Sequence, residues 1–110
     1  MSWLRVLYGL LRTSQTWAAL GTARADGEND QYPSGEKHAF VVMAQSDQQQ
    51  VESRVVALLN SNEWNDVVVD SIKQLASPFH SDDATLLGCY AAATRDGSAS
   101  IIYSDPIPDS

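Results

Sequence analysis

The sequence predicts a small α+β domain, a two-layer α/β sandwich that is ferredoxin-like in general shape. Its 110 residues are the size of one domain. Its composition, 44% apolar and 19% charged, is that of a globular chain rather than a disordered one. After an N-terminal helix-like segment, strand and helix patterns alternate as βαβαβ. Right-handed crossovers then predict both helices on one face of the sheet. The other face would stay open to another chain or a ligand.

Residues 1–25 are predicted to form an amphipathic segment packed on the core. Large apolar residues recur at helical spacing: Trp3, Leu4, Leu7, Leu10, Leu11 and Trp17. No apolar run approaches the ~20 residues needed to span a bilayer. Export with cleavage near Ala25 is the alternative, because residues 23–25 read "ARA", but Arg12 and Gln15 interrupt the apolar run. One cysteine cannot form an internal disulfide, which fits the expected cytoplasmic location.

Residues 26–36, "DGENDQYPSGE", are predicted to be a loop, because Gly, Pro, Asn, Asp and Ser dominate them. This loop carries four acidic residues and separates the N-terminal segment from a compact domain over residues 37–110.

The compact domain begins with the most clearly patterned step of the chain. Residues 38–45, "HAFVVMAQ", form a short apolar run typical of a buried strand. Ser46 is a candidate N-cap with Gln49 as its capping-box partner, and apolar residues follow at helical spacing. The helix is expected to fade in "NSN", residues 60–62.

Residues 63–79 are ambiguous between strand and helix. Three consecutive valines favour a strand over residues 66–74. A helical stripe is the alternative, through Trp64, Val68, Ile72, Leu75 and Phe79. Pro78 ends either element.

Residues 82–95 are predicted to be a helix. Ser81 is the candidate N-cap, and Asp82 and Asp83 fall in the first turn, where negative charge is favourable. Gly97 is a plausible C′ residue. A hairpin turning at residues 96–97 is the alternative. Residues 98–104 then form the closing strand.

The residue types that carry chemistry do not combine into a catalytic, cofactor or metal motif. Cys89 lies mid-helix, where a small buried apolar role is expected. His80, Ser81 and Asp82 are close in sequence, but catalytic triads assemble from separate segments. No metal-ligand spacing and no phosphate-binding glycine loop occurs in the sequence. We therefore expect that the chain is not an enzyme and binds no cofactor or metal.

Charge indicates the kind of partner. Fourteen acidic residues against seven basic ones give a net charge of −7, which repels nucleic acid and attracts basic protein surfaces. The first hypothesis is a non-catalytic protein-interaction module, comparable to small inhibitor or immunity proteins, with a basic protein as its partner. Its candidate contacts are Glu28, Asp30, Tyr32, Trp64, Asp66 and Asp70; core packing is the alternative for Trp64. The second hypothesis is a homodimer that binds a small ligand. A membrane span is not expected.

Overall fold

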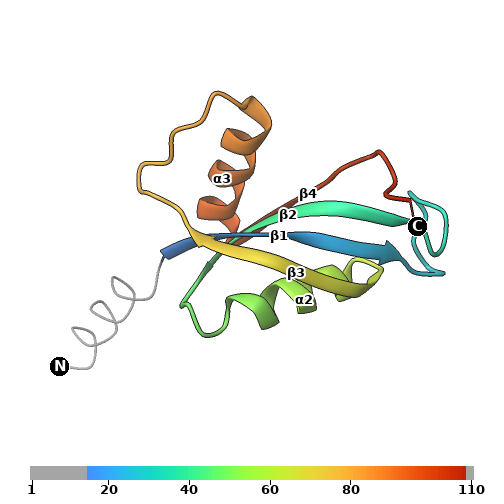
Figure 1. Cartoon of the computed structure of the whole chain (residues 1–110). Helices are drawn as coiled ribbons and strands as arrows, with labels where there is room; N and C mark the ends of the chain where they lie inside the picture. The colour runs from blue at the N-terminus through green and yellow to red at the C-terminus, as the bar shows by residue number, and fades with distance from the viewer. Residues whose placement is uncertain (1–14, 109–110) are drawn as a thin grey trace.

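The computed structural model describes residues 15–108. Four strands and two helices follow one another in this part of the chain (Figure 1). They are β1 (Gln15–Ala25), β2 (Lys37–Ser46), α2 (Val51–Ser61), β3 (Trp64–Gln74), α3 (Ala84–Asp96) and β4 (Ser98–Ile102). The predicted small α+β domain is confirmed. The strand preference for residues 66–74 and the helix preference for residues 82–95 are confirmed as well.

The four strands form one antiparallel sheet in the order β3-β1-β2-β4. β1 and β2 are the central hairpin, and β3 and β4 are the two edges. The ferredoxin-like order is not confirmed, because the predicted βαβαβ core left out β1. This strand occupies a central position instead.

β1 corrects the prediction of an N-terminal helix-like segment, which was wrong for residues 15–25. Trp17 and Ala19 belong to the core on one face of the sheet, whereas Ala18 belongs to the core on the other. This alternation is the period of two of a strand. The predicted helical stripe ends at Trp17. The remainder of that stripe, in residues 1–14, lies outside the described residues.

The helices cover opposite faces of the sheet, so the prediction of both on one face was wrong. Val55 and Leu59 of α2 pack with Phe40 and Val42. The other face of β2 packs on α3, where Cys89 and Ala93 join a cluster with Val41 and Met43. The physical reason lies in the unbroken apolar run of β2. Residues 40–44 are all buried, which requires cover on both faces.

The helix ends follow the sequence in part. Gly97 ends α3 with φ 97°, a left-handed conformation that suits glycine, as predicted. Asp83, rather than Ser81, is the N-cap of α3, and its carboxylate accepts from the backbone N–H of Thr85 and Leu86. Ser46 was the wrong N-cap for α2, because Ser46 is the last residue of β2 and the N-cap is Gln50, four residues later.

Gly21 allows β1 and β3 to approach closely. A Cβ atom at this position would lie 1.9 Å from the carbonyl oxygen of Val68 and 2.9 Å from the ring of Phe40. The register of β1 with β3 shifts beside it, between Leu20 and Gly21. Only a residue without a side chain fits this contact between two strands.

Candidate functional site

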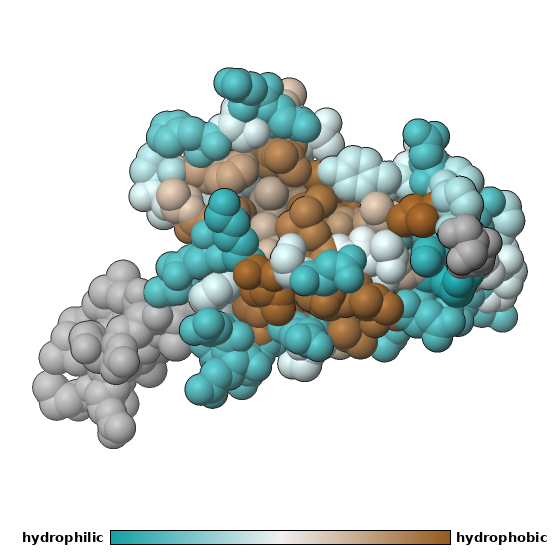
Figure 2. All heavy atoms as spheres, in the orientation of Figure 1, coloured by the Kyte–Doolittle hydropathy of each residue, from teal (hydrophilic) through white to brown (hydrophobic). Residues whose placement is uncertain are grey.

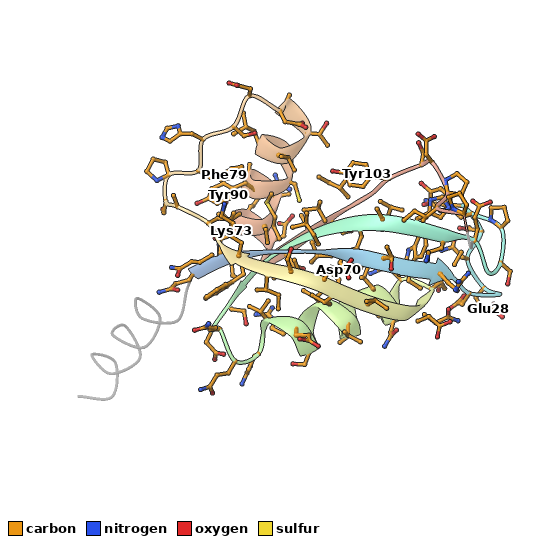
Figure 3. The ribbon with its side chains drawn as sticks, viewed as in Figure 1. Glu28, Asp70, Lys73, Phe79, Tyr90 and Tyr103 are labelled. Atoms are coloured by element: carbon orange, nitrogen blue, oxygen red, sulfur yellow. The ribbon has the colours of Figure 1, made fainter. Side chains whose placement is uncertain are left out.

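The predicted acidic contacts Glu28 and Asp30 are exposed on the loop between β1 and β2. The loop is held by hydrogen bonds at its base. Asn29 donates from Nδ2 to the carbonyl oxygen of Glu63 at 3.1 Å, and Asp26 donates from its backbone N–H to the same oxygen at 3.1 Å. Glu28 therefore projects from an anchored loop, at the end of the sheet far from α3 (Figure 3).

Tyr32 and Trp64 come together, but inside the domain. Trp64 is 5% exposed and belongs to the core between α2 and the sheet. The ring of Tyr32 lies 5.5 Å from that of Trp64 and 4.3 Å from that of His38, measured between centroids. Trp64 therefore lies in the core, as the alternative interpretation predicts, and Tyr32 is half-buried against it.

Asp66 and Asp70 are exposed on β3, an edge strand. Asp66 has a positive φ of 49°, and the Nε of Arg24 lies 4.0 Å from its carboxylate. A bulge also separates Ser71 from Val69 in the pairing with β1. Of the predicted contacts, Trp64, Asp66 and Asp70 lie on β3, whereas Glu28 and Asp30 lie on the loop next to the N-terminal end of this strand.

A surface that the sequence did not predict lies on the face of the sheet that carries α3. α3 covers one end of this face through Cys89 and Ala93. Two neighbouring cross-strand rows lead away from α3, and in the first of them Val41 and Ile101 still pack against the α3 cluster. We call these two rows the open sheet face; they are Ser71, Leu20, Val41 and Ile101, and then Val68, Thr22, Ala39 and Tyr103.

The open sheet face exposes large apolar side chains. Leu20 is 44% exposed, Val68 52% and Tyr103 46%. Figure 2 shows apolar side chains gathered over the middle of the molecule, bordered by hydrophilic ones, and Figure 3 shows Tyr103 on the same side of the sheet as α3. An apolar patch with a polar border is typical of interaction sites.

The only sequence signal for this surface was the run of three valines. In a strand, successive side chains point to opposite faces. Val67 and Val69 pack against the α2 core, so Val68 points the other way. Leu20 lies on the neighbouring strand β1, one row from Val68. Tyr103 ends the row of Val68 at the opposite edge of the sheet, beyond Thr22 and Ala39. That the three side chains share one face depends on register, which periodicity does not give.

His38, at the start of the predicted buried strand, is itself buried. Its Nδ1 lies 2.7 Å from the carbonyl oxygen of Tyr103, and its Nε2 lies 2.7 Å from a carboxylate oxygen of Glu36. Because a carbonyl oxygen only accepts, Nδ1 carries a proton. Both ring nitrogens are therefore engaged, and the ring ties the start of β2 to the end of β4. This arrangement suits a structural role rather than a general base.

Cys89 is 7% exposed, and burial raises the pKa of its thiol, while a backbone hydrogen bond at Met43 lowers it less. A raised pKa leaves little thiolate, which is the nucleophilic form. We expect the thiol to react with Ellman's reagent much more slowly in the native protein than in denaturant. Equal rates in the two conditions would contradict this burial.

A polar hollow of about 290 Å³ opens at the other end of the sheet, beside α3. Glutamine side chains from three strands line it with Tyr90 and Thr94. In residues 15–108, no cluster of three or more His, Cys, Asp or Glu side chains is arranged to hold a metal ion. The hollow therefore offers neutral hydrogen-bonding groups.

Comparison of the chain with family models, with curated proteins and with solved structures found no match. Neither α2 nor α3 is long and apolar enough to cross a membrane.

Proposed function

We propose that the chain is a non-catalytic protein-interaction module that binds a protein partner through the open sheet face. The observation that carries the proposal is the exposure of Leu20, Val68 and Tyr103 on two adjacent rows of the sheet. Burying such side chains against a partner is favourable by roughly 25 cal/mol per Å² of apolar surface. Large apolar residues left in water also promote aggregation, which a partner would prevent.

Charge supports a partner with basic groups around an apolar centre. Asp66 and Asp70 lie along β3 on either side of Val68, and Glu28 and Asp30 extend the acidic border onto the loop. Opposite charges at the rim of an interface speed association and favour the correct partner. The engaged nitrogens of His38 and the buried thiol of Cys89 support the non-catalytic part of the proposal.

The test is site-specific photo-crosslinking in the cells from which the protein comes. A photoreactive phenylalanine analogue at position 68, and separately at position 20, should capture one protein partner. The same analogue at position 53, an exposed position on α2, should not. Reversal of Asp66 and Asp70 to lysine should reduce capture from position 68. Capture from position 53 alone, or from none of the positions, would overturn the proposal.

Self-association is a second candidate, because the same apolar rows could pack on those of a second copy. Like charge opposes it, since each copy carries −7. Crosslinking from position 68 into another copy of the chain, with a dimer at micromolar concentration in sedimentation, would favour it. A monomer under those conditions would exclude it.

A further inference from the structure

The outer edge of β4 presents a regular set of unpaired backbone groups. Tyr103 donates from its backbone N–H to Ala39 at 3.0 Å, and Gln45 donates to the carbonyl oxygen of Gly97 at 2.9 Å. In an antiparallel pair, residues alternate between groups that point at the partner strand and groups that point away. The even-numbered residues between them, Ser98, Ser100 and Ile102, therefore direct their N–H and C=O groups outward.

The two edges of the sheet differ in how well they are protected against another strand. β3 carries two register irregularities and the exposed charges Asp66, Asp70 and Lys73, and bulges and charges of this kind block strand addition. β4 reads "SASII" and pairs with β2 residue by residue, without a register shift. It has no charged residue and no proline. Among the described strands, β4 is thus the edge without charges or register shifts.

A groove runs beside this edge on the face that carries α2. Its volume is about 430 Å³, and its floor is formed by the buried residues Val42 and Ala44. The remaining lining residues are Arg54, Ala57, Leu58, Ser61 and Ser98. α2 therefore forms one wall of the groove and β4 the other. A strand added to β4 would direct every second side chain toward α2.

The charge of Arg54 in the groove favours a ligand with a negatively charged group. Arg54 is the one charged residue in the lining, and its Nη1 donates to the carbonyl oxygen of Gln45. Gln45 lies opposite Gly97, so Arg54 stands at the Ser98 end of the groove. A guanidinium has five N–H groups, which leaves donors for a carboxylate. On a chain of charge −7, this groove is a locally basic site.

We propose that the free edge of β4 binds an extended peptide segment of another protein. The segment adds a fifth strand to the sheet, places alternate small apolar side chains in the groove against α2, and sets a carboxylate against Arg54. Main-chain hydrogen bonds to an edge strand supply affinity in this mode of recognition, and the pockets beside it supply specificity. A second copy of the chain is disfavoured as the occupant, because two acidic chains repel each other. This site uses the edge of β4 and the groove on the α2 side of the sheet, whereas the open sheet face lies on the side that carries α3.

The test uses the full chain and a displayed library of random peptides, with the selected peptides resynthesised for affinity measurement. Ser100→Pro is the decisive variant. It removes an N–H that points outward, so the pairing with β2 is kept while strand addition is blocked. The loss of a hydrogen bond and the clash should weaken binding by about tenfold or more. Ser100→Lys gives a second block in case the proline disturbs folding.

Arg54→Glu tests the carboxylate, with Lys73→Glu on the opposite edge as a control that changes net charge equally. We expect about tenfold weaker binding for the first and less than about twofold for the second. Failure to select any peptide, or equal binding by all variants, would overturn the proposal. A homodimer broken by Ser100→Pro would make a second copy the occupant and also overturn it. Peptides lost only on Val68→Lys would bind the open sheet face and support the proposed function instead.

Discussion

Gly21→Ala is expected to destabilise the domain by roughly 3 kcal/mol or more, at the upper end of what overpacking costs. The added Cβ would lie 1.9 Å from the carbonyl oxygen of Val68, and a backbone atom of a paired strand cannot move aside as a side chain can. β1 and β3 would have to separate along a central contact of the sheet. Urea unfolding followed by the fluorescence of the buried Trp17 and Trp64 measures the loss.

Gly88→Ala is the matched control for Gly21→Ala. Gly88 lies inside α3, and a Cβ there meets no atom within 4 Å. Alanine favours a helix over glycine by about 1 kcal/mol, so this variant should be more stable than the parent. Equal unfolding midpoints for Gly21→Ala and the parent would show that β1 and β3 do not approach as described.

Trp64→Ala is expected to cost about 3–5 kcal/mol of stability, the range for removing a buried large aromatic side chain. Trp64 fills the core between α2 and the sheet, where it packs with Ala25 and Leu59. Its ring also lies 5.7 Å from that of His38, between centroids. Thermal and urea unfolding monitored by circular dichroism measure the effect.

Tyr103→Ala is the control for Trp64→Ala, because it removes an aromatic side chain from the surface instead of the core. Tyr103 is an exposed aromatic side chain whose backbone, rather than its ring, contacts His38 and Ala39. Its removal should change stability by less than about 1 kcal/mol, and it should weaken capture of a partner by the open sheet face. A Trp64→Ala variant as stable as Tyr103→Ala would contradict the buried position of Trp64.

Local patterns predicted five of the described elements. The apolar run before residue 46, the triple valine and the glycine at position 97 each act within a few residues, and the structure follows them. β1 was missed because residues 15–25 carry alanines that suit either period, and a helical stripe through Trp17 was preferred. The ferredoxin-like strand order is not confirmed, and the faces of the helices were predicted wrongly, since both depend on where β1 enters the sheet.

Part of the candidate site could also be predicted from the sequence, and part could not. Exposed acids such as Asp66 and Asp70 follow from their charge, and the structure leaves them on the surface. The open sheet face could be identified only from the register between β1 and β3, which puts Leu20 and Val68 on the same face. Which backbone groups of β4 point outward could be inferred only from the hydrogen bonds at both ends of this strand. These properties belong to pairs of strands rather than to any single stretch of sequence.

The order of the strands also sets how fast the sheet can form. Among the described strands, only β1 and β2 are neighbours both in the chain and in the sheet. β3 pairs with β1 across the intervening β2 and α2, and β4 pairs with β2 across α2, β3 and α3. Each pairing closes a long loop before its hydrogen bonds form. Such non-local pairing puts folding in the slower part of the range for small domains, roughly milliseconds to seconds. During that interval the β1–β2 hairpin has two unpaired edges, so a dilute protein solution favours correct refolding.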